Sequence, residues 1–319
     1  MSLAVPSTSV EPFVAGLLGA IDVDGGPTGE QLSVLSAMAK HLWHREDLVH
    51  SATPIGPTEV AERITDPVTR RRFHEILLTL EVCRHPLTQS QVDRVEQYGS
   101  TLHFEGPDLQ ILRDLVDSGV TAASADFKRF LMKNLDARIE PQLRQVHMTA
   151  EPEPELVARL RPLADLPDGT LGRAFIDMYE RNGIPLPGIR GAKMNHWFVA
   201  HDMTHVIAGI DTTIPGEVAL SAFQMALDDN EVNRGALLGS LVVHEAGFAQ
   251  SAKVRSESAT LDAPGAAELL GQEMARGAAC RADFSLIDHL AIAHHPLAEI
   301  RADFGVTPPT DPDDGHHCW

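Results

Sequence analysis

The sequence predicts an all-α protein, and three observations support this prediction. Apolar residues recur three and four positions apart along much of the chain, which places them on one face of a helix. Hydrophobic residues make up 43% of the 319 residues but aromatic residues only 5%, a composition that suits helices packed on helices. Threonines that can cap a helix precede several of these apolar stretches. A chain of this length can bury two cores, so we expect two helical domains.

The first two helices are expected on either side of an acidic, glycine-rich turn at residues 22–28. Phe13, Leu17 and Ile21 form the apolar face of the helix before this turn. Residues 1–10 are small and polar, and we expect them to be frayed.

A capping-box pattern occurs twice in the N-terminal half. Thr28 is followed by Gln31, and Thr88 by Gln91, at the spacing that allows reciprocal bonds at a helix start. The apolar face of the helix after Thr28 contains Leu32, Leu35, Met38, Ala39 and Leu42. Further helices are expected at residues 68–81, 107–116 and 127–146.

Two capped helices, each behind a turn, resemble the TerB-like (tellurite-resistance type) helical module over about residues 12–140. That family carries paired acids in both copies, whereas the second copy here has His85 and Pro86. This departure argues against metal binding by the module. We therefore interpret Asp22 and Asp24 as turn-forming residues.

Alternating Pro and Glu at residues 149–155 predict a linker, because such a segment is extended and does not pack. We expect the TerB-like module at residues 1–148 and a second helical domain at residues 156–310. Residues 311–319 are rich in Pro and Asp and are predicted to be a disordered tail, whose histidines would capture metal only adventitiously.

In the second domain, helices are expected at residues 172–182 and 196–208. Residues 211–216 break the latter helix. Thr213 can cap the next one, with Pro215 in its first turn.

Two apolar stretches follow. Leu220, Phe223 and Leu227 continue a helical stripe up to Asp228. Residues 235–249 are apolar on nearly every side, so they are predicted to form a central helix or to line an apolar cavity.

The main candidate site is the pair His201 and His205. Four residues apart on a helix, their imidazoles project from one face. Asp202 borders this face, and Glu217 lies at the start of the next helix, where it can face the histidines. Two imidazoles with one or two carboxylates form a donor set suited to zinc, iron or manganese. The chain holds 16 histidines, so one such pair is expected by chance and the spacing alone is weak evidence.

The sequence around these residues resembles the coenzyme Q biosynthesis family number four (the CoQ-four family). The matching signature is His-Asp-Met-Thr-His at residues 201–205, followed after eleven residues by Glu217. Upstream, Leu-Pro-Asp-Gly-Thr-Leu-Gly at residues 166–172 is similar to the start of that family's entry helix. Pro-Leu-Ala-Glu-Ile-Arg at residues 296–301 is similar to its closing segment. The three matches stand in the family's order and cover about residues 155–308.

The resemblance implies one divalent metal, zinc or iron ahead of manganese, held by catalytic residues His201, Asp202, His205 and Glu217. Asp202 could ligate the metal or orient a histidine from outside the ligand set. The implied substrate is a prenylated aromatic ring, or another lipid-like molecule, in an apolar cavity. The implied reaction is oxidative decarboxylation at C1, where a hydroxyl replaces the carboxylate, alongside organisation of a complex with other quinone-biosynthesis proteins. The additional N-terminal module departs from the typical family member and leaves the substrate open.

Two other functions stay open. A lipid-binding scaffold would use the same residues for a structural metal without an exchangeable water. An HD-type phosphohydrolase would share the dipeptide at His201 and Asp202, but it needs an upstream histidine on a separate helix and a later aspartate. This chain offers His196 beside the same segment and Glu217 downstream.

A zincin-type metalloprotease is excluded by the residues that follow the last apolar stretch. His244 and Glu245 begin like the zincin motif, but Phe248 stands where the second histidine is required. We interpret His244 and Glu245 as polar helix positions, with the lining of a substrate cavity as the alternative.

Charge and composition exclude further classes. The formal charge of −19 repels phosphate backbones, so a nucleic-acid partner is not expected. Cys83, Cys280 and Cys318 form no CxxC pair, which indicates a reducing cytoplasm. No apolar run reaches 18 residues, and the first ten residues lack the pattern of a signal peptide. We expect a cytoplasmic homo-oligomer, with peripheral contact to the inner face of the membrane left open.

Overall fold

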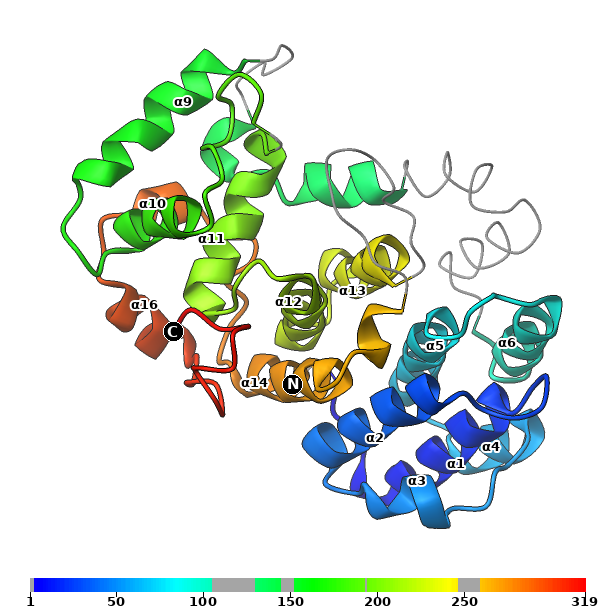
Figure 1. The fold of residues 1–319 in the computed structure, drawn as a ribbon. Helices are drawn as coiled ribbons and strands as arrows, with labels where there is room; N and C mark the ends of the chain where they lie inside the picture. Colours follow the sequence, from blue (N-terminus) through cyan, green and yellow to red (C-terminus); the bar gives the residue numbers. More distant parts are fainter. Residues whose placement is uncertain (1–2, 105–129, 145–151, 193, 246–258) are drawn as a thin grey trace.

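The computed structural model describes residues 3–104, 130–144, 152–192, 194–245 and 259–319, and this part of the chain is all-α (Figure 1). Among these residues, strand-like pairing is restricted to two isolated bridges, Thr170 with Pro296 and Ile210 with His317. The predicted fold class is therefore confirmed. None of the described helices is both long and apolar enough to cross a membrane.

Helices α1 to α6 form the N-terminal group, with bounds α1 Val10–Ile21, α2 Gly29–Trp43, α3 Asp47–Ser51, α4 Pro57–Arg63, α5 Pro67–Val82 and α6 Gln89–Thr101. Their core is built around aromatic rings. Phe13 makes edge contacts with Trp43 and Phe73 at centroid distances of 5.2 and 5.4 Å, and Phe73 stacks on Tyr98 at 5.6 Å. The Tyr98 hydroxyl donates to the Ile55 carbonyl, so this polar atom is satisfied within the core.

Both predicted capping boxes are present. Thr28 caps α2 with Gln31 as its reciprocal partner, and Thr88 caps α6 with Gln91. The turn before α2 meets the turn before α6, because the Thr88 hydroxyl donates to Asp24 Oδ2 at 2.6 Å. Asp24 has a φ of 48°, which agrees with its interpretation as a turn-forming residue.

The C-terminal part contains α9 Pro154–Leu160, α10 Leu171–Arg181, α11 Val199–Ala208, α12 Ile214–Leu227, α13 Glu231–His244, α14 Ala266–Ala279, α15 His289–Ile292 and α16 Leu297–Phe304. Thr213 caps α12 as predicted, since its hydroxyl accepts from the Gly216 N–H at 3.1 Å. The helix predicted at residues 107–116 lies outside the described residues. So do parts of the stretches predicted at residues 127–146 and 235–249.

Helices α12, α13 and α14 lie between the two groups of helices (Figure 1). Ala222 of α12, Leu241 of α13 and Leu270 of α14 belong to the same buried cluster as the core of α1 to α6, whereas Leu220 and Phe223 of α12 belong to the second cluster. Helix α14 lies directly against the backbone of α2 at one glycine and against that of α12 at another. A Cβ on Gly271 would lie 2.8 Å from the Ala37 carbonyl of α2, and one on Gly277 would lie 2.2 Å from the Phe223 carbonyl oxygen of α12.

A second buried cluster joins α9, α10, α11 and α16, and includes Leu156, Phe175, Met203 and Ile300. The division at residues 149–155 stays a prediction. The structure adds that the first core extends across that division into α12, α13 and α14.

The predicted disordered tail at residues 311–319 requires correction. The Cys318 N–H donates to the Gly209 carbonyl at 2.9 Å, and the Asp211 N–H donates to the His316 carbonyl at 2.8 Å. His317 is 9% exposed and contacts Glu273 of α14 through Nε2 at 3.1 Å. Composition alone suggested disorder, but backbone pairing and a buried histidine hold this segment against α14 and the end of α11.

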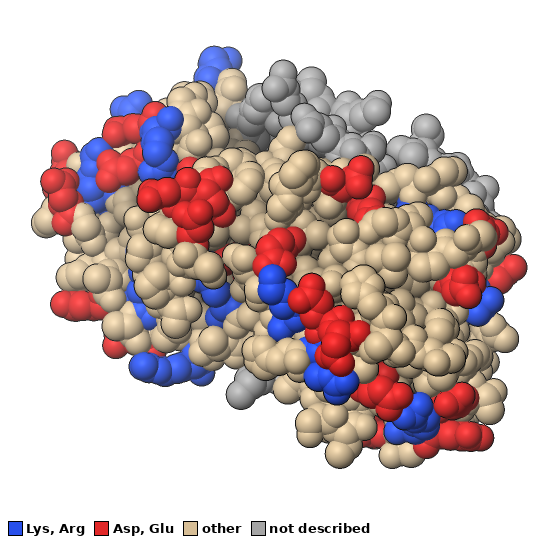
Figure 2. Space-filling model, turned by 60° about the horizontal axis from the view of Figure 1, so that its bottom comes forward, with Lys and Arg blue, Asp and Glu red and all other residues tan. Residues whose placement is uncertain are grey.

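The surface carries both signs of charge. On the face shown in Figure 2, Asp and Glu side chains alternate with Lys and Arg, and uncharged areas separate them. The described residues of that face form no continuous basic patch of the kind that binds a phosphate backbone.

Candidate metal site

The candidate site lies where α11 ends and α12 begins. His201 and His205 are one turn apart on α11, and Glu217 is in the first turn of α12. Gly209 ends α11 in the left-handed conformation, with a φ of 71°, and its N–H donates to the His205 carbonyl at 2.8 Å. The turn that follows reverses the chain, so that Glu217 faces the two histidines.

Three side chains converge at this point. His201 Nε2 lies 3.1 Å from Glu217 Oε2, His205 Nε2 lies 3.3 Å from the same oxygen, and the two Nε2 atoms are 3.2 Å apart. Ligands of a four-coordinate zinc ion with bonds of about 2.0–2.1 Å are separated by roughly 3.3 Å. The three donor atoms are therefore spaced as they would be around one small cation.

His205 is oriented for coordination by its backbone neighbour. Its Nδ1–H donates to the Ile210 carbonyl at 3.0 Å, with the tautomer assigned from this contact. Nε2 faces His201 and Glu217, and in the neutral ring it would direct its lone pair toward a bound ion. The side chain of His205 is fully buried, whereas those of His201 and Glu217 are 20% and 23% exposed. The cluster is thus open on one side, where a fourth ligand could enter.

The electrostatics of the cluster follow from its donor set. Burial alone would lower the pKa of His205, but the adjacent Glu217 carboxylate raises it to about 9. Burial would likewise raise the pKa of Glu217, yet the two imidazoles hold it well below its usual value. Without a metal, the site consequently holds an ion pair, and a metal would replace the proton on His205.

The fourth predicted residue, Asp202, does not join this cluster. Its carboxylate accepts a hydrogen bond from the Tyr179 hydroxyl of α10, and His201, His205 and Glu217 form the group of mutually close ligand atoms without it. Burial raises the pKa of Asp202 to about 6. In this arrangement Asp202 ties α10 to α11 beside the cluster.

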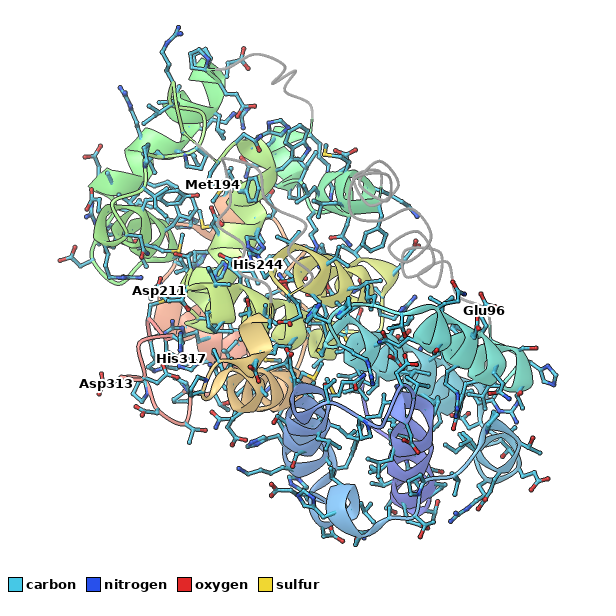
Figure 3. All side chains as sticks on the ribbon, turned by 45° about the vertical axis from the view of Figure 1, so that its right-hand side comes forward. Glu96, Met194, Asp211, His244, Asp313 and His317 are labelled. Atoms are coloured by element: carbon cyan, nitrogen blue, oxygen red, sulfur yellow. The ribbon has the colours of Figure 1, made fainter. Side chains whose placement is uncertain are left out.

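His244 is a neighbour of the site that sequence spacing did not assign to it. It is 8% exposed at the end of α13, where Figure 3 labels it, and its Nδ1 has no hydrogen-bond partner among the described residues. Burial lowers its pKa, so the ring is neutral at pH 7. Glu217 and His201 also act electrostatically on its pKa, which Glu217 raises and His201 lowers. The sequence predicts the lining of a cavity by His244 only as an alternative, because His244 follows Glu217 by a whole helix and a turn and no spacing links the two residues.

Two arginines secure the end of α11, and neither was predicted to do so. Arg301 donates to the carbonyls of Val206 and Ile207 at 2.9 and 3.1 Å, and Arg276 donates to the Ala208 carbonyl at 2.9 Å. Trp319 covers the Arg301 guanidinium at 3.9 Å from the ring centroid. Figure 3 shows His317 of the same segment beside α14. These contacts fix the turn whose Ile210 carbonyl orients His205.

Comparisons with protein families, curated sequences and solved structures do not identify a family for this chain. No protein-family model matches the chain, and no curated protein sequence matches it. One solved structure to which the chain is similar is a "Putative ubiquinone biosynthesis protein" from Nostoc punctiforme PCC 73102, with 18% identity and a TM-score of 0.34. The match covers 74% of this chain and 98% of that one. A likeness this weak supports no statement about fold or function, so the chain is assigned to no family.

Proposed function

We propose that this chain is a metal-dependent protein of quinone biosynthesis that acts on a prenylated aromatic ring. The observation that supports the proposal most is the convergence of His201, His205 and Glu217 at separations of 3.1–3.3 Å. The motif around these residues resembles the CoQ-four signature, and this resemblance is the source of the substrate class.

The donor set fits a divalent ion. His201, His205 and Glu217 would hold it, and the exposed edges of His201 and Glu217 leave room for a further ligand. When bound, such an ion polarises an oxygen-bearing group of the substrate. The expected overall reaction replaces the ring carboxyl group at C1 by a hydroxyl and releases carbon dioxide. It is a two-electron oxidation in which dioxygen and one water are consumed and hydrogen peroxide is formed.

The protein's own groups have distinct roles in this proposal. His205 and Glu217 keep the ligand set rigid, because His205 is fixed by the Ile210 carbonyl. Asp202 and Tyr179 position α10 against α11. The His244 ring lies within electrostatic range of Glu217 and His201, and its buried Nδ1 has no hydrogen-bond partner among the described residues.

Metal analysis tests the first part of the proposal. Wild type should bind one ion at this cluster, and His205→Ala should lose it while staying folded by circular dichroism. His50→Ala serves as the control, because His50 is exposed on α3, a helix that carries none of the ligands. Full retention of metal at this cluster in folded His205→Ala would refute the site.

A labelled substrate tests the second part. Metal-loaded protein incubated in air with a prenylated hydroxybenzoate carrying ¹³C in its carboxyl group should release labelled carbon dioxide and form the ring hydroxyl. His205→Ala should release none. If metal-loaded wild type binds the compound without turnover, a scaffold with a structural metal becomes the better description.

The phosphohydrolase alternative is disfavoured by one contact. An HD-type site requires the aspartate of its His-Asp pair as a metal ligand, whereas Asp202 accepts the Tyr179 hydroxyl. Hydrolysis of a phosphodiester by the metal-loaded protein, lost in Asp202→Asn, would reverse this preference.

A further inference from the structure

A second convergence of ligand-type side chains lies away from the site described above. Glu30 is in the first turn of α2, His85 follows α5, and Glu245 directly follows α13. One ligand atom from each lies within 4.8 Å of the other two. The three residues are distant in sequence, and packing of α1 to α6 against the central helices brings them together.

The donor atoms are held in place by the protein. His85 Nε2 lies 2.9 Å from Glu245 Oε1, and Glu245 Oε2 accepts the Leu261 N–H at 2.9 Å. The side chain of Glu245 is fully buried. Neighbouring groups therefore position both of its carboxylate oxygens, as is typical of a preorganised binding site.

Glu30 supplies an independent indication of a missing partner. The residue is 9% exposed, its buried Oε1 accepts no hydrogen bond from a described donor, and its carboxyl group approaches that of Glu245. A buried carboxylate oxygen without a partner costs free energy, so such groups are normally paired or bound to a cation. Burial and a side-chain hydrogen bond with Glu245 raise the pKa of Glu30 to about 9, so the two carboxyl groups share a proton that a bound cation would displace.

The balance of charge also favours a cation. Two carboxylates meet here, and Asp262 adds a third negative charge that acts on Glu30. Among the described residues, the positive partner recorded for this group is His85, which is uncharged when it ligates a metal. Without a metal, Glu30 keeps a proton beside Glu245, and a divalent ion would displace this proton and neutralise both carboxylates.

We propose that Glu30, His85 and Glu245 form a second site for a divalent transition-metal ion, with Zn²⁺ or Mn²⁺ as the class that suits one imidazole and two carboxylates. The His85 side chain is 28% exposed, which leaves a side open for water ligands. The ion would connect α2, the segment after α5 and the end of α13. It is therefore a structural clamp between the N-terminal helices and the central helices.

The second site is linked to the first site because Glu245 and His244 are adjacent in the sequence. His244 lies within electrostatic range of His201 and Glu217, and the next residue, Glu245, is a ligand of the second site. Fixing Glu245 would fix the end of α13 and with it the position of the His244 ring. The second site does not depend on the function proposed for the first.

Counting bound zinc in single-site variants tests the proposal. Protein stripped with a chelator and dialysed against Zn²⁺ should retain two ions per chain by elemental analysis. His85→Ala and His205→Ala should each retain one, and the double variant none. His85 is at the surface, so its replacement should leave the fold intact, and His50→Ala is the matched control.

The thermal midpoint gives a second readout. Added Zn²⁺ should raise the Tm of His205→Ala, in which only the second site remains, and should fail to raise that of the double variant. Glu30→Gln in the His205→Ala background should weaken Zn²⁺ binding by at least the roughly 10–100-fold that loss of an outer partner costs.

The outcomes separate the two sites. One ion that is lost with His85→Ala but kept with His205→Ala supports the clamp and refutes the first site. One ion that is lost with His205→Ala but kept with His85→Ala overturns the clamp. A Glu30→Gln variant that binds zinc as tightly as its parent and has a higher Tm also overturns the proposed second site. Such a result would mean that Glu30 and Glu245 share a proton in the wild type and bind no metal.

Discussion

At the scale of single residues, the candidate site depends on how His205 is protonated. Its Nδ1 is committed to the Ile210 carbonyl, and Glu217 raises its pKa to about 9. The imidazolium is the stable form at neutral pH in the absence of metal, whereas a metal binds only the neutral ring. Metal and proton therefore compete for Nε2.

We predict that zinc binding at this site releases about one proton per ion at pH 7, because His205 carries that proton below about pH 9. Affinity should rise with pH up to that value and then level off. Calorimetric titration of a His85→Ala variant, in which only this site binds, in buffers of different ionisation enthalpy measures the released protons. A binding enthalpy that is the same in every buffer would contradict the protonation state assigned to His205.

Asp202 and Tyr179 give a second prediction at this scale. Because Asp202 accepts the Tyr179 hydroxyl and lies outside the ligand cluster, Asp202→Asn should keep the metal but weaken its binding by about 10–100-fold. Tyr179→Phe should leave the buried carboxylate short of a donor and destabilise the fold by about 1–3 kcal/mol. Zinc titration and urea unfolding measure these effects. Complete loss of the ion in folded Asp202→Asn would make Asp202 a ligand.

At the scale of elements, the end of α11 is secured by groups from three other segments. Arg276 of α14 and Arg301 of α16 donate to its last carbonyls, and the 311–319 segment pairs with the turn that follows. Carbonyls at a helix end lack partners within the helix, and cations placed there offset the helix dipole. This arrangement explains how a short turn can hold His205 and Glu217 in a fixed relation.

Removal of residues 311–319 should therefore lower zinc affinity at the His205 site by about tenfold, the effect expected for loss of an outer support. Trp319→Ala alone should cost only about 0.5–1 kcal/mol of stability, since Trp319 is 41% exposed over Arg301. Asp313→Ala, an exposed change in the same segment, is the control. Unchanged zinc affinity in the truncated protein would show that Arg276 and Arg301 hold the end of α11 in place without the 311–319 segment.

At the scale of the whole molecule, the first core is shared between the N-terminal helices and α12, α13 and α14. Gly271 allows α14 to touch the Ala37 backbone of α2. A side chain at this position would force the two helices apart, because backbone atoms cannot yield as a flexible side chain can.

We predict that the protein unfolds in one cooperative step and that Gly271→Leu destabilises it by about 1–3 kcal/mol or more. Gly29→Ala is the matched control, because a Cβ there meets nothing within 4 Å, so stability should hold or rise by up to about 1 kcal/mol. Urea unfolding followed by far-ultraviolet circular dichroism and tryptophan fluorescence should give coincident transitions. Two separated transitions would favour the independent domains predicted from the linker composition.

The sequence by itself determined the local features of this protein. Helical periodicity predicted the all-α class, and the Thr28 and Thr88 capping boxes and the Thr213 cap are present as predicted. These features depend on residues three or four positions apart, whose relation is fixed by helix geometry. The same local geometry placed His201 and His205 on one face of α11.

Only the tertiary structure decided which distant groups meet. It turned Asp202 toward Tyr179, away from the group of His201, His205 and Glu217, and brought His244 within electrostatic range of that group. It also docked the 311–319 segment that composition predicted to be disordered. Burial, helix crossings and hydrogen bonds between remote segments decide such contacts. The spacing of residues along the chain predicts a contact only between neighbouring elements, as for Glu217 and the two histidines.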